Sequence, residues 1–70
     1  MPDVEVVITN IDSARAGLNA ARNAAETWRA GAVAGVAHSN AQTTALSAAI
    51  TVGLNTAKTS ITATETELAG

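Results

Sequence analysis

The chain has 70 residues, of which 47% are hydrophobic, and a formal net charge of −2. A chain of this length forms one domain, and such a small domain buries only about 60% of the surface that its unfolded form exposes. The absence of cysteine excludes disulfides and thiolate metal sites, and four basic residues are too few for a surface that binds nucleic acid.

The hydrophobic residues are mostly small. Alanine accounts for 17 of them, Trp28 is the one aromatic residue, and the larger aliphatic residues are four Leu, four Ile and six Val. At about 25 cal/mol per Å² of buried apolar surface, this set barely offsets the roughly 1 to 2 kcal/mol of backbone entropy lost per ordered residue. We therefore expect the chain to form a homo-oligomer or to bind a helical protein partner.

The first nine residues suggest an extended arm. Val4, Val6 and Ile8 alternate with neighbours in a manner typical of strands, and Thr9, Asn10 and Asp12 are all suitable helix caps. We expect the arm to span residues 1–9 and the first helix to begin near residue 10. A helix that begins near Asp3 is the alternative, and it would lengthen the same heptad pattern.

A helix is predicted over residues 10–30, which are rich in strong helix formers. Two lines of residues seven apart alternate at spacings of three and four, which is the pattern of a helix–helix seam. One line is Val4, Ile11, Leu18, Ala25 and Ala32, and the other is Val7, Ala14, Ala21 and Trp28.

Three arginines, Arg15, Arg22 and Arg29, also recur every seven residues beside these lines. They could select a partner by pairing with its carboxylates. The simpler interpretation is that they are solvated charges with local pairs, Arg15 with Asp12 and Arg22 with Glu26, each worth a few tenths of a kcal/mol.

The chain is predicted to reverse over residues 31–39, where Gly31 and Gly35 lie in an uncharged stretch and glycine supplies the left-handed conformation of a helix end. A second helix is predicted over 40–68. We expect an all-α single domain, 1–70, formed by an antiparallel helical hairpin that packs into an oligomeric helix bundle. Its predicted interaction seam comprises Ile11, Leu18, Trp28, Ile50, Leu54, Ile61 and Leu68.

The sequence offers little for catalysis. His38 is the only histidine, and a single histidine beside a turn is typically a solvent-facing or capping residue. Glu65 and Glu67 are two apart, so on a helix they point in different directions. We expect no enzyme activity, no cofactor, no metal site and no small-molecule substrate.

Two further sequence features concern location. The acids Asp3 and Glu5 stand where a signal peptide would carry positive charge, so we expect no signal peptide. The longest uncharged stretch, Ala30 to Ala57, is too rich in polar residues for a membrane span, which predicts a soluble protein. A virion component and a protein secreted without a leader are both compatible with these features.

The tetrapeptide Trp28-Arg29-Ala30-Gly31 at the end of the first predicted helix resembles the turn of WXG100 proteins, with two residues rather than one between Trp and Gly. These are small helical hairpins secreted by type VII systems, and they dimerise into four-helix bundles. The resemblance implies that Trp28 and Gly31 shape the turn and help to dock a partner. The heptad alone predicts instead a seam tryptophan and a helix-ending glycine.

Three hypotheses for function follow. The leading one is a structural or interaction protein that self-associates or packs into a larger assembly such as a virion, a fibre or a secretion complex. The second, implied by the resemblance, is a WXG100-like dimer that acts as a type VII effector or adaptor. The third is an ice-binding or surface-binding helix, suggested by Thr51 and Thr62, which are eleven residues apart.

Overall fold

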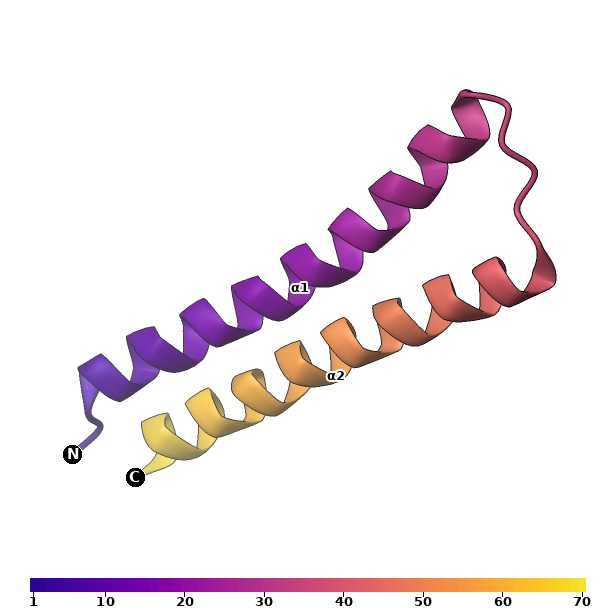
Figure 1. Ribbon diagram of the computed structural model, residues 1–70. Coiled ribbons are helices and arrows are strands. Elements are labelled where there is room, and N and C mark those ends of the chain that lie inside the picture. The colour runs from indigo at the N-terminus through magenta and orange to yellow at the C-terminus, as the bar shows by residue number, and fades with distance from the viewer.

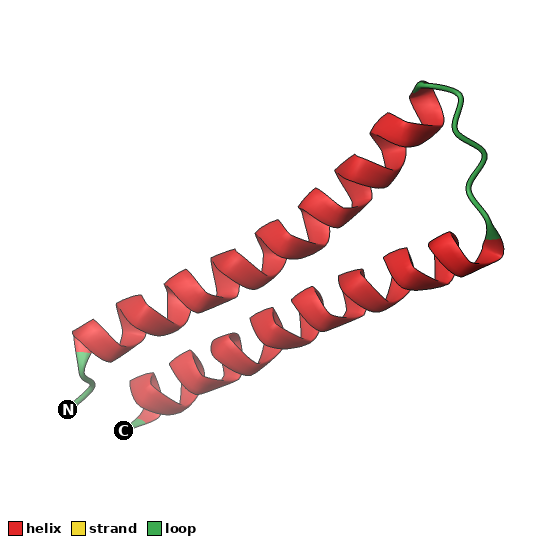
Figure 2. Ribbon diagram, in the orientation of Figure 1, coloured by secondary structure: helices red, strands yellow, loops and turns green.

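The computed structural model describes all 70 residues and consists of two antiparallel helices of equal length. Helix α1 spans Val4–Val33 and helix α2 spans Asn40–Ala69. They lie side by side along their length, diverge toward the connecting turn, and leave both chain ends together at the opposite end (Figures 1 and 2). The expected all-α antiparallel hairpin is confirmed. Neither helix contains a stretch that is apolar enough over a sufficient length to cross a membrane.

Helix α1 begins at Val4, so residues 4–9 are helical and do not form the extended arm that we expected. The Asp3 carboxylate caps the helix by accepting hydrogen bonds from the backbone N–H groups of Glu5 and Val6. The backbone N–H of Asp3 in turn donates to Glu67 Oε1 of α2 at 2.8 Å. These contacts outweigh the weak helix propensity of the β-branched residues that follow.

The turn is shorter than predicted, because α1 continues through Gly31 to Val33. Gly35 has a φ of +88° and ends the helix. The N–H of Val36 donates to the carbonyl of Gly31 at 2.9 Å, and the N–H of Gly35 donates to that of Ala32 at 3.1 Å. This hydrogen-bond pattern is the Schellman motif, in which a left-handed glycine satisfies the last carbonyls of a helix.

Helix α2 begins with a reciprocal cap. The Ser39 hydroxyl accepts from the N–H of Gln42 at 3.1 Å, and the Gln42 side chain accepts from the N–H of Ser39 at 2.8 Å. This capping box satisfies two N–H groups that have no partner within the helix. The helix therefore begins at Asn40, as the sequence predicted.

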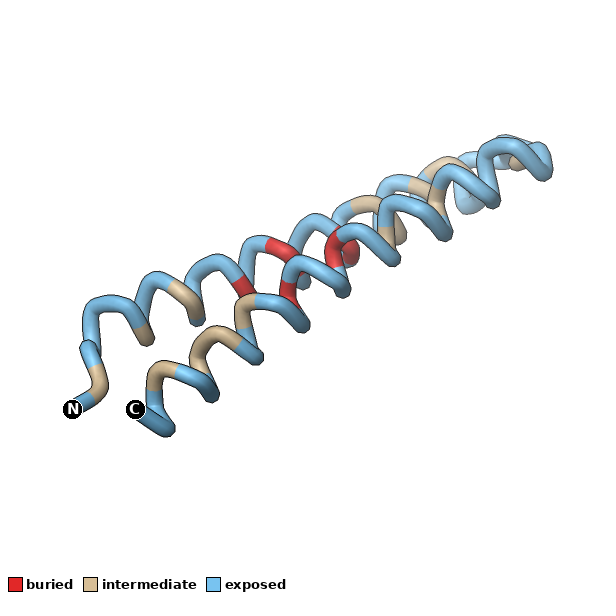
Figure 3. The backbone as a smooth tube through the Cα atoms, turned by 90° about the horizontal axis from the view of Figure 1, so that it is seen from below, coloured by how far each residue is buried: buried red, intermediate tan, exposed pale blue.

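The buried core consists only of small residues near the middle of the hairpin (Figure 3). No large side chain is fully buried. The buried residues are Ala14, Gly17 and Ala21 of α1 with Gly53 and Ala57 of α2.

Backbones meet directly at Gly17 and Gly53. A Cβ atom on Gly17 would lie 2.6 Å from the carbonyl oxygen of Gly53, and one on Gly53 would lie 2.6 Å from that of Gly17. No real Cβ atom approaches a backbone oxygen so closely, so only glycine fits at either position. This contact fixes how far the two helices are shifted along each other.

Candidate interaction surfaces

The seam between the two helices is formed by residues that alternate at spacings of three and four on each helix. All of them are buried or half-buried. On α1 they are Val7, Asn10, Ala14, Gly17, Ala21, Ala24, Trp28 and Gly31, and on α2 they are Leu46, Ile50, Gly53, Ala57, Ser60, Thr64 and Glu67. One of the two lines predicted from the sequence, the one from Val7 to Trp28, therefore lies in this seam.

The other predicted line lies beside the seam and carries three large apolar side chains, Val4, Ile11 and Leu18. Leu18 directly follows Gly17, and Leu54 directly follows Gly53, so the contact between the glycines places the two leucines level with each other. In an antiparallel pair of helices, residues that follow equivalent seam positions point to the same side. Leu18 and Leu54 thus share one face of the hairpin.

The same relation repeats every seven residues along both helices toward the chain ends. It pairs Leu18 with Leu54, Ile11 with Ile61, and Val4 with Leu68. These six side chains are 45 to 64% exposed. We call this surface the ladder face. Beyond Leu18 and Leu54, the next pair on this face is the small Ala25 and Ser47.

The structure thus divides the predicted interaction residues between two places. Trp28 and Ile50 lie in the seam within the hairpin. The remaining five lie on the ladder face and stay 45 to 57% exposed in the single chain: Ile11, Leu18, Leu54, Ile61 and Leu68.

The three arginines lie on the exposed surface of α1. Arg15 pairs with Asp12 at 3.4 Å, as predicted. The predicted pair of Arg22 with Glu26 is wrong, because Glu26 pairs at 2.7 Å with Arg29, one turn further along the helix. Arg22 makes no salt bridge within the chain.

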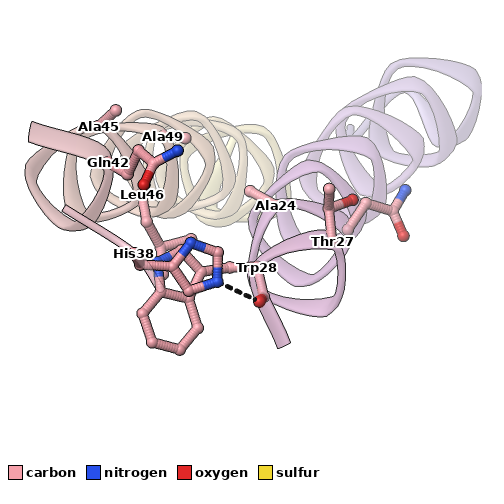
Figure 4. Close-up of a pocket in the computed structure, with 9 residues that line it drawn as sticks. Ala24, Thr27, Trp28, His38, Gln42, Ala45, Leu46 and Ala49 are labelled. Carbon is pink, nitrogen blue, oxygen red and sulfur yellow. Dashed lines mark hydrogen bonds between the residues drawn. The ribbon is translucent and has the colours of Figure 1, made fainter. Parts of the chain in front are cut away.

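The opposite face of the hairpin has two open hollows instead of paired large side chains. Near the turn, a hollow of about 500 Å³ extends between the helices and is lined by Trp28, His38 and Leu46, among others (Figure 4). A neighbouring hollow of about 520 Å³ is lined chiefly by small residues, including Ala20 and Ala49.

His38 anchors the turn to the end of α1. Its ring stacks on the Trp28 indole, with centroids 4.1 Å apart and an interplanar angle of 19°. His38 Nε2 lies 2.8 Å from the carbonyl oxygen of Trp28 (Figure 4), and since a carbonyl only accepts, this nitrogen carries the proton and donates. A Cβ on Gly31 would meet the imidazole at 3.1 Å, so Gly31 leaves room for the ring.

Trp28 fills the seam at the turn end, while its indole N–H is buried without a hydrogen-bond partner. Gly31 does not end the helix, and Gly35 does. The pair formed by Trp28 and His38 closes the widest part of the hairpin, where the helices diverge. Its geometry indicates a structural role, since the imidazole already donates to a backbone carbonyl and stacks on an aromatic ring.

The chain brings no three His, Asp or Glu side chains together in a group able to hold a metal ion. What the arrangement offers is surface: a ladder of large apolar side chains on one face and shallow hollows on the other. Comparison with known proteins found no match to a family, to a curated protein or to a solved structure.

Sequence reasoning missed Gly17 and Gly53 as the centre of the hairpin. The signal was present, because they are single glycines within long helical patterns, where glycine costs about 1 kcal/mol relative to alanine unless close packing requires it. Gly17 is three residues from Ala14 and four from Ala21, and Gly53 is four from Ala57. Such spacing of small residues permits helices to approach closely.

Proposed function

We propose that this chain is a non-enzymatic structural or interaction protein, a helical hairpin that acts by packing against other helices in an assembly. One observation carries the proposal: the hairpin buries only alanine and glycine, while eleven of its fourteen Val, Ile and Leu residues stay at least 40% exposed. An isolated chain would gain little free energy from such a core. Covering the exposed side chains with further helices supplies the missing apolar burial.

The assembly in which such a hairpin would act is a virion, a fibre or a secretion complex. Helix α1 is capped by Asp3 at its start and by the Schellman motif at its end, so few of its terminal backbone groups are left unsatisfied. We therefore expect partners to bind along the long faces of the hairpin.

A second candidate is a WXG100-like dimer that acts as a type VII effector or adaptor. The observation in its favour is the position of Trp28, which lies at the turn end of a two-helix hairpin and packs against the turn residue His38. Expressing the chain in bacteria with and without a functional type VII secretion system would test export. Export that persists without that system would contradict this candidate.

Light scattering of the purified chain tests the leading proposal. We expect a solution mass that is a multiple of the chain mass at micromolar concentration, because the exposed aliphatic side chains favour association. For a purified chain that is monomeric and unfolded, the measurement is repeated after a candidate partner chain is added. A monomer that remains fully helical at every concentration would contradict the proposal.

A further inference from the structure

We propose that the ladder face binds a second copy of this chain, with the turn end of one hairpin lying over the open end of the other. The open end is the one that holds both chain termini (Figure 1). This inference rests on the proposed function and adds to it a surface, a partner and an orientation.

Six of the twelve exposed large hydrophobic residues lie on the ladder face, where they form pairs. Three successive levels of the ladder face present two aliphatic side chains each, one from α1 and one from α2. The levels are seven residues apart, which is about 10.5 Å along a helix. Such a double row is typical of the interior of a four-helix bundle, where two hairpins stack through flanking positions of both helices.

The size of the face suits a dimer. The Cα trace measures 54 by 17 Å in its two longer directions. The rectangle that encloses the trace therefore has an area of about 900 Å², which leaves room for the roughly 800 Å² per partner that a stable interface of standard size buries. A second copy presents a surface of the same length and the same character.

The charges favour opposite ends together. The half near the open end has a net charge of −3, because it holds two bases, Arg15 and Lys58, and five of the six acids: Asp3, Glu5, Asp12, Glu65 and Glu67. The half near the turn carries Arg22 and Arg29 against the single acid Glu26. Stacking like ends would place the two acidic halves together, whereas stacking opposite ends places Arg22, which has no salt bridge of its own, in the field of the partner's acidic half.

The sizes of the side chains on the ladder face favour the same orientation of the two hairpins. If the hairpins overlap fully, with the level of Leu18 and Leu54 at the centre, Ile11 faces Ala25 of the partner subunit and Ile61 faces Ser47 of the partner subunit. Large side chains then meet small ones, which lets the two layers interdigitate. With like ends together, large side chains would oppose large ones near the open end, and alanine and serine would leave gaps near the turn.

A pair of matched variants tests the surface. Leu18→Asp places a charge at the centre of the ladder face, and Val52→Asp places the same charge at an exposed valine that lines the hollow on the other face. In sedimentation across a concentration series, we expect Leu18→Asp to weaken dimerisation at least 100-fold and Val52→Asp to leave it within about threefold of the original chain.

The outcomes separate this inference from the proposed function. An original chain that is a stable helical monomer contradicts both. If dimers persist with Leu18→Asp but dissociate with Val52→Asp, the ladder face is not the dimer interface. The proposed function would then stand, with the opposite face as the interface. Circular dichroism of each variant shows whether a lost dimer reflects a lost interface or an unfolded chain.

Cross-linking tests the orientation and also covers the case in which Leu18→Asp does not fold. The chain has no cysteine, so Leu18→Cys and Leu54→Cys each introduce a single thiol. With opposite ends together, each variant alone should form a covalent dimer with a short bis-maleimide, because each residue meets its own copy. Cross-linking only when the two variants are mixed would show like ends together and would overturn the orientation.

Discussion

At the scale of single residues, the hairpin depends on the absence of two side chains. Gly17 and Gly53 let the helix backbones touch, and the alanines around them add little apolar area of their own. Close approach improves dispersion contacts between the backbones, which a larger side chain would hold apart. The helix-weakening effect of glycine is therefore offset by packing at these two positions.

Replacing Gly17 with alanine should destabilise the protein even though alanine is the better helix former. The new Cβ would meet backbone atoms of Gly53 and Ala57 at 2.6 and 2.9 Å, so the helices must separate. Overpacking costs about 1 to 3 kcal/mol, and the gain in helix propensity is about 1 kcal/mol. We expect a net loss of about 1 kcal/mol, measured as a lower midpoint in thermal unfolding followed by circular dichroism.

Asn19→Ala is the matched control for Gly17→Ala. Asn19 is exposed on the same helix, so alanine there raises helix propensity without meeting another residue. The control should unfold at the same temperature or slightly higher. If Gly17→Ala stabilised the protein as much as Asn19→Ala, the close contact of the helices would be disproved.

At the scale of the elements, the sequence predicted both helices and the position of the reversal, because alanine-rich segments with heptad spacing leave little alternative. It favoured a start of α1 near residue 10 and gave the observed start beside Asp3 only as the alternative. The alternating valines there are compatible with a strand, and the contact that decides, Asp3 N–H to Glu67, joins opposite ends of the chain. Local patterns contain no information about such a pairing.

The cap of α2 can be tested alone. Ser39→Ala removes the hydroxyl that accepts from Gln42 and dissolves the capping box. The loss of such a cap costs about 1 kcal/mol, which lowers the unfolding midpoint of a domain of this size by about 4 to 8 °C. Ser13→Ala, at an exposed site within α1, serves as the control and should not lower the midpoint. Equal midpoints for the two variants would argue against the cap.

At the scale of the whole molecule, the candidate surfaces were only half accessible to sequence reasoning. The two heptad lines were visible in the sequence, but which of them would face the other helix was not. The glycine contact rotates α1 so that Ala14, Gly17 and Ala21 face α2. This rotation directs Leu18 outward, although side-chain size alone would have placed it inside. Close backbone packing took precedence over the burial of large side chains.

The division of small residues to the seam and large residues to the ladder face determines how the stability of the chain should depend on its concentration. A chain that buries its largest side chains only on association gains stability from its partner by mass action. In the proposed assembly, folding and association are therefore linked, because the side chains that could complete the core of one chain instead form its outer surface.

The most direct test is the midpoint of thermal unfolding, followed by circular dichroism at 222 nm over about a hundredfold range of chain concentration. We predict that the midpoint rises steadily with concentration, since the proposed dimer couples folding to association. A midpoint that stays constant over the whole range, in a chain that is fully helical, would show that the hairpin is stable alone and would contradict the account.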